Sequence, residues 1–134
     1  MIIDANVWVS KFLVEDAHHA ATENWLDRLT DDDMLFVPAL ALAEVAGAIA
    51  RRTGESYLAR WATDWLLDTP HLRVVGVDAA LGIEAARVAS AHRLKGADAV
   101  YAALAASLDL PLVTWDDEFS SRLTGVIDIR RPAP

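Results

Sequence analysis

Short apolar runs and longer stretches of helical spacing alternate along almost the whole chain, and this alternation constrains the fold most strongly. The apolar runs have the length of buried strands and fall at residues 1–3, 34–37, 72–77, 112–114 and 126–129. The helical patterns begin near residue 7 and continue at 18–29, 39–52, 57–67, 79–93 and 97–108. We therefore expect an α/β fold, with a central parallel five-stranded sheet flanked by helices on both faces.

The length of 134 residues suits one compact domain, which we place at residues 1–130, followed by a short proline-rich tail at 131–134. The chain has no cysteine, which excludes a disulfide framework, a thiolate metal site and a cysteine nucleophile. The first residues lack the basic head of a secretory leader. The most apolar stretch, 34–50, is too short to span a membrane and carries Pro38 and Glu44. We expect a soluble cytoplasmic protein without a membrane partner.

The formal net charge of −8 counts against binding to nucleic acid, because phosphate groups are contacted by lysine and arginine. Divalent cations held by a cluster of acids would remove several negative charges locally. The basic residues, Arg51, Arg52 and Arg60 among them, would also help if they gather on one side of the molecule. The charge therefore does not exclude an RNA substrate.

Two aspartates follow predicted strands directly. Asp4 comes after the first strand, and Asp116 comes two residues after the strand that ends at Thr114. Active sites in sheets of this kind collect beyond the carboxyl ends of the strands, so both acids are expected at one edge. The alternative is that each aspartate only caps the helix that follows it.

Glu44 interrupts a helix in which every other residue from 39 to 50 is apolar or glycine. A glutamate that serves solubility normally lies among other polar residues on a solvated face. Burying this carboxylate without a partner would cost several kcal/mol, so we expect a metal or a cation beside it. The alternatives are a helix with one wet side and a buried pair with an arginine.

Asp98 opens the helix after Gly96 and is the only acid between Glu84 and Asp109. The rest of that helix is almost wholly apolar, which predicts a buried helix whose single acid faces a site. The helix dipole alone also favours an aspartate in a first turn, and this is the competing explanation.

Taken together, Asp4, Glu44, Asp98 and Asp116 predict a metal site. Carboxylates about 4 Å apart repel by about 4 kcal/mol at an effective dielectric of 20, so such a cluster requires protons or cations. Oxygen ligands without histidine or cysteine favour Mg²⁺ or Mn²⁺. A hard divalent ion can activate water and stabilise an in-line attack on a phosphodiester. The residues alone thus lead to a nuclease hypothesis.

Four segments in order resemble the PIN domain, and in particular VapC-type toxins of bacterial toxin–antitoxin pairs. These segments are residues 2–8 (IIDANVW), 42–45 (LAEV), 95–105 (KGADAVYAALA) and 112–116 (LVTWD). The resemblance covers essentially the whole chain. It implies a Mg²⁺- or Mn²⁺-dependent endoribonuclease, in which the four acids named above bind the metal and act in catalysis.

The resemblance also implies supporting residues and partners. Asn6 matches a position that supports the first acid, and Thr114 matches a supporting hydroxyl near the fourth. Asp117 stands beside Asp116 and competes with it for the role of fourth acid. The family further implies an RNA substrate, a homodimer and a cognate antitoxin that blocks the site, often with a basic side chain.

Other residues are weaker candidates for the site. Trp8 and Trp115 each lie close to a proposed acid and are the better candidates for stacking on RNA bases. His18 and His19 are adjacent, so they point about 100° apart on a helix and do not easily share a metal. Arg51 and Arg52 end a helix, where the dipole explains them without RNA.

Two other classes of function compete with the nuclease. One is a catalytically silent PIN-like domain that binds a protein partner, against which the retention of all four acids argues. The other is a phosphoryl-transfer or receiver-type α/β domain, which would place a lysine near the phosphate. Only Lys11 and Lys95 are present, and neither follows a predicted strand.

Overall fold

The computed structural model describes residues 1–132, and within them seven helices surround a five-stranded sheet. The strands are β1 (Ile2–Ile3), β2 (Leu35–Pro38), β3 (Leu72–Val75), β4 (Leu112–Val113) and β5 (Ile129–Arg130). The helices are α1 (Ala5–Phe12), α2 (His19–Leu26), α3 (Leu40–Thr53), α4 (Ser56–Asp68), α5 (Ala79–His92), α6 (Gly96–Leu108) and α7 (Asp117–Leu123). All strand pairs are parallel, in the order β3-β2-β1-β4-β5. The predicted α/β fold is confirmed.

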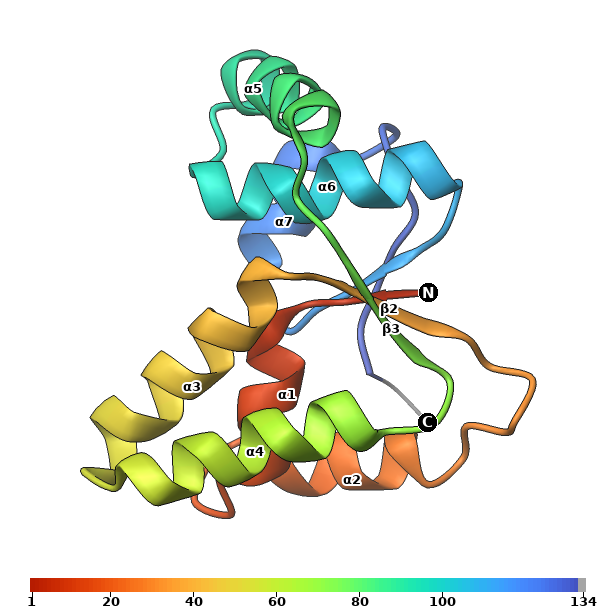
Figure 1. The fold of residues 1–134 in the computed structure, drawn as a ribbon. Helices are drawn as coiled ribbons and strands as arrows, with labels where there is room; N and C mark the ends of the chain where they lie inside the picture. Colours follow the sequence, from red (N-terminus) through yellow and green to blue (C-terminus); the bar gives the residue numbers. More distant parts are fainter. Residues whose placement is uncertain (133–134) are drawn as a thin grey trace.

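The sheet lies between two layers of helices (Figure 1). Helices α1 to α4 lie on one side of it, and α5, α6 and α7 lie on the other. Strand β1 is central in the sheet, and its residues Ile2 and Ile3 have no exposed surface. Because β1 and β4 are neighbours, the loops that leave their carboxyl ends emerge side by side.

Helix α3 ends where the sequence predicts. Gly54 follows Thr53 with a φ of 76°, a left-handed conformation that glycine adopts at little cost, and its N–H bonds back to the carbonyl of Ala50. The stop matters for the site, because it leaves Arg51 and Arg52 in the last turn of α3.

Two elements near the carboxyl terminus differ from the prediction. Helix α7 was not predicted, because it is seven residues long and only Phe119 and Leu123 in it are buried. The fifth strand was predicted at 126–129, and this position is wrong. Pairing with β4 places the strand at Ile129–Arg130, since Leu112 aligns with Ile129, while Val126 belongs to the turn that ends α7 and is half exposed.

The predicted tail at 131–134 is described only in its first half. Arg131 forms an ion pair with Asp117 of α7, and Pro132 is buried, whereas residues 133–134 lie outside the described part. No helix within residues 1–132 is long and apolar enough to cross a membrane.

Candidate active site

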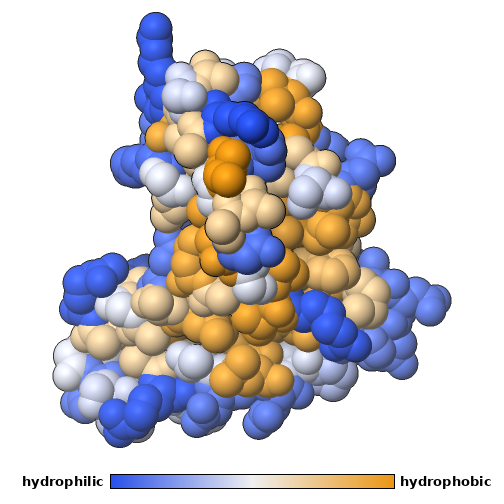
Figure 2. Space-filling model, turned by 45° about the horizontal axis from the view of Figure 1, so that its top comes forward, coloured by the Kyte–Doolittle hydropathy of each residue, from blue (hydrophilic) through white to orange (hydrophobic). Residues whose placement is uncertain are grey.

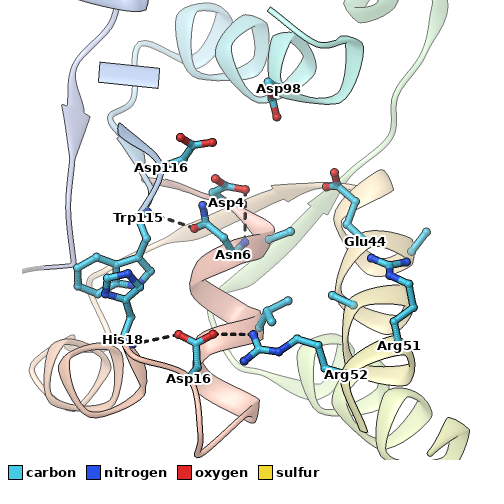
Figure 3. Close-up of a pocket in the computed structure, with 14 residues that line it drawn as sticks. Asp4, Asn6, Asp16, His18, Glu44, Arg51, Arg52, Asp98, Trp115 and Asp116 are labelled. Atoms are coloured by element: carbon cyan, nitrogen blue, oxygen red, sulfur yellow. Dashed lines mark hydrogen bonds and ion pairs between the residues drawn. The ribbon is translucent and has the colours of Figure 1, made fainter. Parts of the chain in front are cut away.

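A pocket of about 670 Å³ opens at the carboxyl ends of β1 and β4 (Figure 3). Four acids from four different elements line it, and we call them the acidic quartet: Asp4, Glu44, Asp98 and Asp116. Figure 3 shows their carboxylates turned toward the same space, Asp98 from above and Glu44 from the side of α3. The structure therefore brings together the four acids that the sequence singled out.

Asp4 is the most buried member of the quartet, with 7% of its surface exposed. It caps α1, since Oδ1 accepts from the N–H of Asn6 at 3.4 Å, and Oδ2 accepts from the hydroxyl of Thr114 at 2.6 Å. Burial raises the pKa of Asp4 from 3.8 to about 7, with smaller contributions from Glu44 and Asp98. A carboxylate in this setting is costly to ionise without a cation beside it.

Asp116 caps the next helix in the same way. Its Oδ1 accepts from the N–H of Glu118 at 2.7 Å, at the start of α7. The capping role considered for Asp4 and Asp116 is thus confirmed, and both side chains also line the pocket. Asp117 is exposed and pairs with Arg131, so it does not line this pocket.

The two predicted supporting residues connect the ends of β1 and β4. The amide of Asn6 donates to Thr114 Oγ1 at 3.0 Å and accepts from the backbone N–H of Trp115 at 3.2 Å. Thr114 is 1% exposed, and its hydroxyl also accepts from the N–H of Asp116 at 3.0 Å. These bonds fix the position of Asp4 relative to Asp116.

Glu44 is half buried and accepts a hydrogen bond of 2.6 Å from the hydroxyl of Tyr101. The alternative of a buried arginine partner is therefore wrong. The alternative of a helix with one solvent-exposed side is correct, because the neighbouring Ala43 is exposed. Burial raises the pKa of Glu44, and Asp98 raises it further, while the bond from Tyr101 lowers it. Tyr101 was not predicted as a site residue, although its hydroxyl is the only polar side-chain group between Asp98 and Ser107.

Asp98 lies in the first turn of α6, where residues 99–105 are all buried, as predicted. The aspartate itself is half buried and faces the pocket. Burial raises its pKa, Lys95 lowers it, and Asp116 and Glu118 raise it. Electrostatic interactions therefore connect all members of the quartet.

The quartet fits a hard divalent ion by its donor chemistry, because every donor is a carboxylate oxygen. Within residues 1–132, no three acidic or histidine side chains converge closely enough to form a ready-made metal cluster. Carboxylates that converge on one point repel one another, so a closer arrangement would require a cation among them.

The other end of the pocket is basic and aromatic. This end is lined by Asp16, His18, Arg51, Arg52 and Trp115. Arg52 pairs with Asp16 at 2.6 Å, and the ring of His18 stacks on Trp115 with centroids 4.2 Å apart and planes inclined by 8°. Apart from Trp115, the sequence did not predict these residues as part of the site, because α1, α2, α3 and β4 approach one another only in the folded structure.

Trp8 does not belong to this end of the pocket. Its side chain is wholly buried beside Trp65, with ring centroids 6.2 Å apart, so the prediction that Trp8 stacks on bases is wrong. Trp115 remains accessible at the pocket and donates its indole N–H to Thr22.

The sequence profile of the PIN domain matches residues 1–122. The chain belongs to the PIN-domain family. Among curated proteins, no sequence matches it significantly. In structure, this PIN domain is similar to VapC20 of Mycobacterium tuberculosis, described as a sarcin-ricin loop cleaving toxin. The TM-score is 0.80 and the identity is 21%, over 90% of this chain and 92% of that one.

Two further solved structures have the same fold. FitAcB of Neisseria gonorrhoeae has a TM-score of 0.74 and 20% identity, over 98% of this chain and 96% of that one. VapBC2 of Rickettsia felis, bound to a DNA fragment from its promoter, has a TM-score of 0.75 and 14% identity, over 97% and 96%. At these identities the likeness to solved structures establishes the shared fold, and the resemblance to VapC-type proteins is confirmed at that level.

Proposed function

We propose that this PIN domain is a metal-dependent endoribonuclease that hydrolyses RNA phosphodiester bonds at the acidic quartet. The observation that carries the proposal is the gathering of four carboxylates, from the end of β1, from α3, from α6 and from the start of α7, around one pocket. The raised pKa of the buried Asp4 supports it, because no cationic side chain of residues 1–132 pairs with this carboxylate, and a bound cation would stabilise its charge.

Mg²⁺ or Mn²⁺ bound at the quartet would polarise the phosphodiester and activate water for in-line attack. The protein's own part is to hold the carboxylates in place. Thr114 and Asn6 orient Asp4, and the hydroxyl of Tyr101 orients Glu44. Outer hydrogen bonds of this kind fix the direction of ligand oxygens and tune metal affinity.

We further propose that the protein is the toxin of a type II toxin–antitoxin pair. VapC20 is described as a sarcin-ricin loop cleaving toxin, which makes RNA the expected substrate. The resemblance of this chain to VapC-type toxins makes an antitoxin the expected partner. A basic side chain of an antitoxin would be attracted to the quartet and would compete with the metal for it.

A homodimer is part of the same proposal. Three apolar side chains are exposed in this part of the sequence: Val74 of β3 (39%), Val77 between β3 and α5 (40%) and Ile83 of α5 (55%). Figure 2 shows hydrophobic residues gathered across the middle of one face of the molecule. Exposed apolar groups that gather in this way favour burial against a second protomer.

The test is cleavage of a mixed RNA substrate by antitoxin-free protein in Mg²⁺, in Mn²⁺ and in a chelator. Asp98→Asn, purified in parallel, controls for contaminating nuclease. The proposal expects cutting that needs the metal and disappears in the variant. Equal cutting by both preparations would be contamination. No cutting by folded protein on several RNAs would favour a silent PIN-like binding domain instead.

A further inference from the structure

Arg51 lies on the face of α3 that lines the pocket. Glu44, Ala48 and Arg51 follow one another at helical spacing on that face, and all three line the pocket. The side chain of Arg51 folds back along the helix, so that its Nη1 would lie 3.0 Å from a Cβ atom built on Gly47. Figure 3 shows the guanidinium of Arg51 extending from α3 toward Glu44.

The guanidinium of Arg51 is unpaired within the part of the chain that the structure describes, where it forms no hydrogen bond or ion pair. Its neighbour Arg52 differs, because it donates to Asp16 Oδ2 at 2.6 Å. Arg51 is exposed and lines the pocket, so its N–H donors are free to bind a ligand there.

We propose that Arg51 binds a phosphate group of the RNA strand next to the phosphodiester at the acidic quartet. This inference rests on the proposed nuclease function and assigns a substrate-binding residue to the same site. A guanidinium matches two phosphate oxygens with parallel N–H donors, so Arg51 is chemically suited to bind a phosphate group. The need for such a residue is strong, because a protein of net charge −8 otherwise repels a polyanion.

Gly47 provides the space in which the guanidinium lies. A methyl group at this position meets only Arg51, so alanine would be accommodated by a shift of the flexible arginine tip and not by the backbone. Gly47→Ala is therefore a second way to shift the guanidinium of Arg51, by a few tenths of an ångström, without removing its charge. A helix interior also favours alanine over glycine, so this variant should fold at least as well.

The experiment measures binding of a labelled single-stranded RNA decamer in Mg²⁺ by fluorescence anisotropy, with Asp98→Asn as the common background so that the RNA stays intact. Arg51→Ala and Gly47→Ala are added singly. Arg87→Ala is the matched control, because Arg87 is an exposed arginine of α5 outside the pocket that pairs with Glu84. The affinities are measured over a series of salt concentrations.

Arg51→Ala should raise the dissociation constant roughly tenfold or more, as expected for loss of a charge-assisted hydrogen bond. It should also lower the slope of log affinity against log salt by about 0.7, the value for one phosphate of a single strand. Gly47→Ala should weaken binding in the same direction, and Arg87→Ala should change it less than about twofold.

Equal affinities and slopes for Arg51→Ala and Arg87→Ala would overturn the inference, whether or not the natural protein cuts RNA. Arg51-dependent binding of RNA by a protein that cuts no RNA would overturn the proposed function and leave the role of Arg51 standing. Arg51-dependent binding of an acidic peptide, with RNA binding unchanged, would overturn the inference in favour of a protein ligand.

Discussion

The hydroxyl of Thr114 donates a hydrogen bond of 2.6 Å to Oδ2 of Asp4, although 110 residues separate the two in sequence. The hydroxyl oxygen of Thr114 also accepts hydrogen bonds from the side-chain amide of Asn6 and from the backbone N–H of Asp116, each at 3.0 Å. The one proton and both lone pairs of the hydroxyl are thus in use. One buried side chain fixes the ends of β1 and β4, and with them two of the four acids.

Replacing Thr114 by valine should weaken metal binding and RNA cleavage. Valine keeps the shape of threonine but leaves Oδ2 of Asp4 without its donor, which raises the pKa of Asp4 further. Loss of a hydrogen bond to a metal-binding side chain typically lowers metal affinity about 10- to 100-fold. The Mn²⁺ concentration that half-saturates cleavage measures this affinity. Thr114→Ser keeps the hydroxyl and should stay close to the natural protein. If serine and valine behave alike, the hydrogen bond is not responsible.

Tyr101→Phe should have a smaller effect of the same kind. The change removes only the hydroxyl that donates to Glu44, in a side chain that is 1% exposed. A hydrogen bond to a charged group contributes about 1.5–3 kcal/mol, and we expect its loss to lower both the free energy of unfolding and the free energy of metal binding. Urea unfolding and Mn²⁺ titration of cleavage measure the two shares. Tyr57→Phe, in an exposed tyrosine of α4, is the matched control and should change neither.

Asp4 should make the metal-free protein less stable as the pH rises. Its pKa is 3.8 in the unfolded chain and about 7 in the folded protein. Between these values the folded protein holds a proton that the unfolded chain has released, so the free energy of unfolding falls as pH rises from about 4 to about 7. The fall is at most about 4 kcal/mol.

Asp4→Asn lacks this titration and should lose less stability over the same pH window. Urea unfolding in chelator at several pH values, for both proteins, measures the difference. Parallel profiles would mean that Asp4 titrates normally. Added Mn²⁺ should stabilise the natural protein more at pH 7.5 than at pH 5, because the ion competes with the proton.

Asp116→Asn should slow cleavage strongly and leave the fold intact. Asparagine caps a helix about as well as aspartate, so the start of α7 keeps its bond to the N–H of Glu118. The melting temperature should therefore stay nearly unchanged while the rate falls by at least about tenfold, as for a lost metal ligand. Asp117→Asn makes the same change one residue later, outside the pocket, and should cut RNA normally. The opposite result would make Asp117 the fourth acid.

The alternation of strands and helices made the sheet and six of its helices predictable, because each element is amphipathic or buried enough to be read locally. Helix α7 escaped, because its burial depends on Phe119 and Leu123 alone. The fifth strand was misplaced by its apolar run at 126–127, since its register depends on pairing with Leu112 of β4. Neither feature is encoded within the segment itself.

The acids of the site were also predictable from local sequence, because each is a polar group at a strand end or inside an apolar helix. Their partners were not. Tyr101 meets Glu44 across 57 residues, and His18 meets Trp115 from another helix. Trp8 has the sequence position of a site residue, but α1 turns it away from the pocket into the core against Trp65.

The central claim is that the acidic quartet binds the divalent ion on which cleavage depends. Calorimetric titration of Mn²⁺ into the antitoxin-free protein tests it most directly, beside four variants: Asp4→Asn, Glu44→Gln, Asp98→Asn and Asp116→Asn. Asp117→Asn is the control, since it removes the same charge outside the pocket. We predict saturable Mn²⁺ binding that each quartet variant weakens at least about tenfold and the control leaves unchanged. Binding that survives in all four variants, or is absent from the natural protein, would contradict the account.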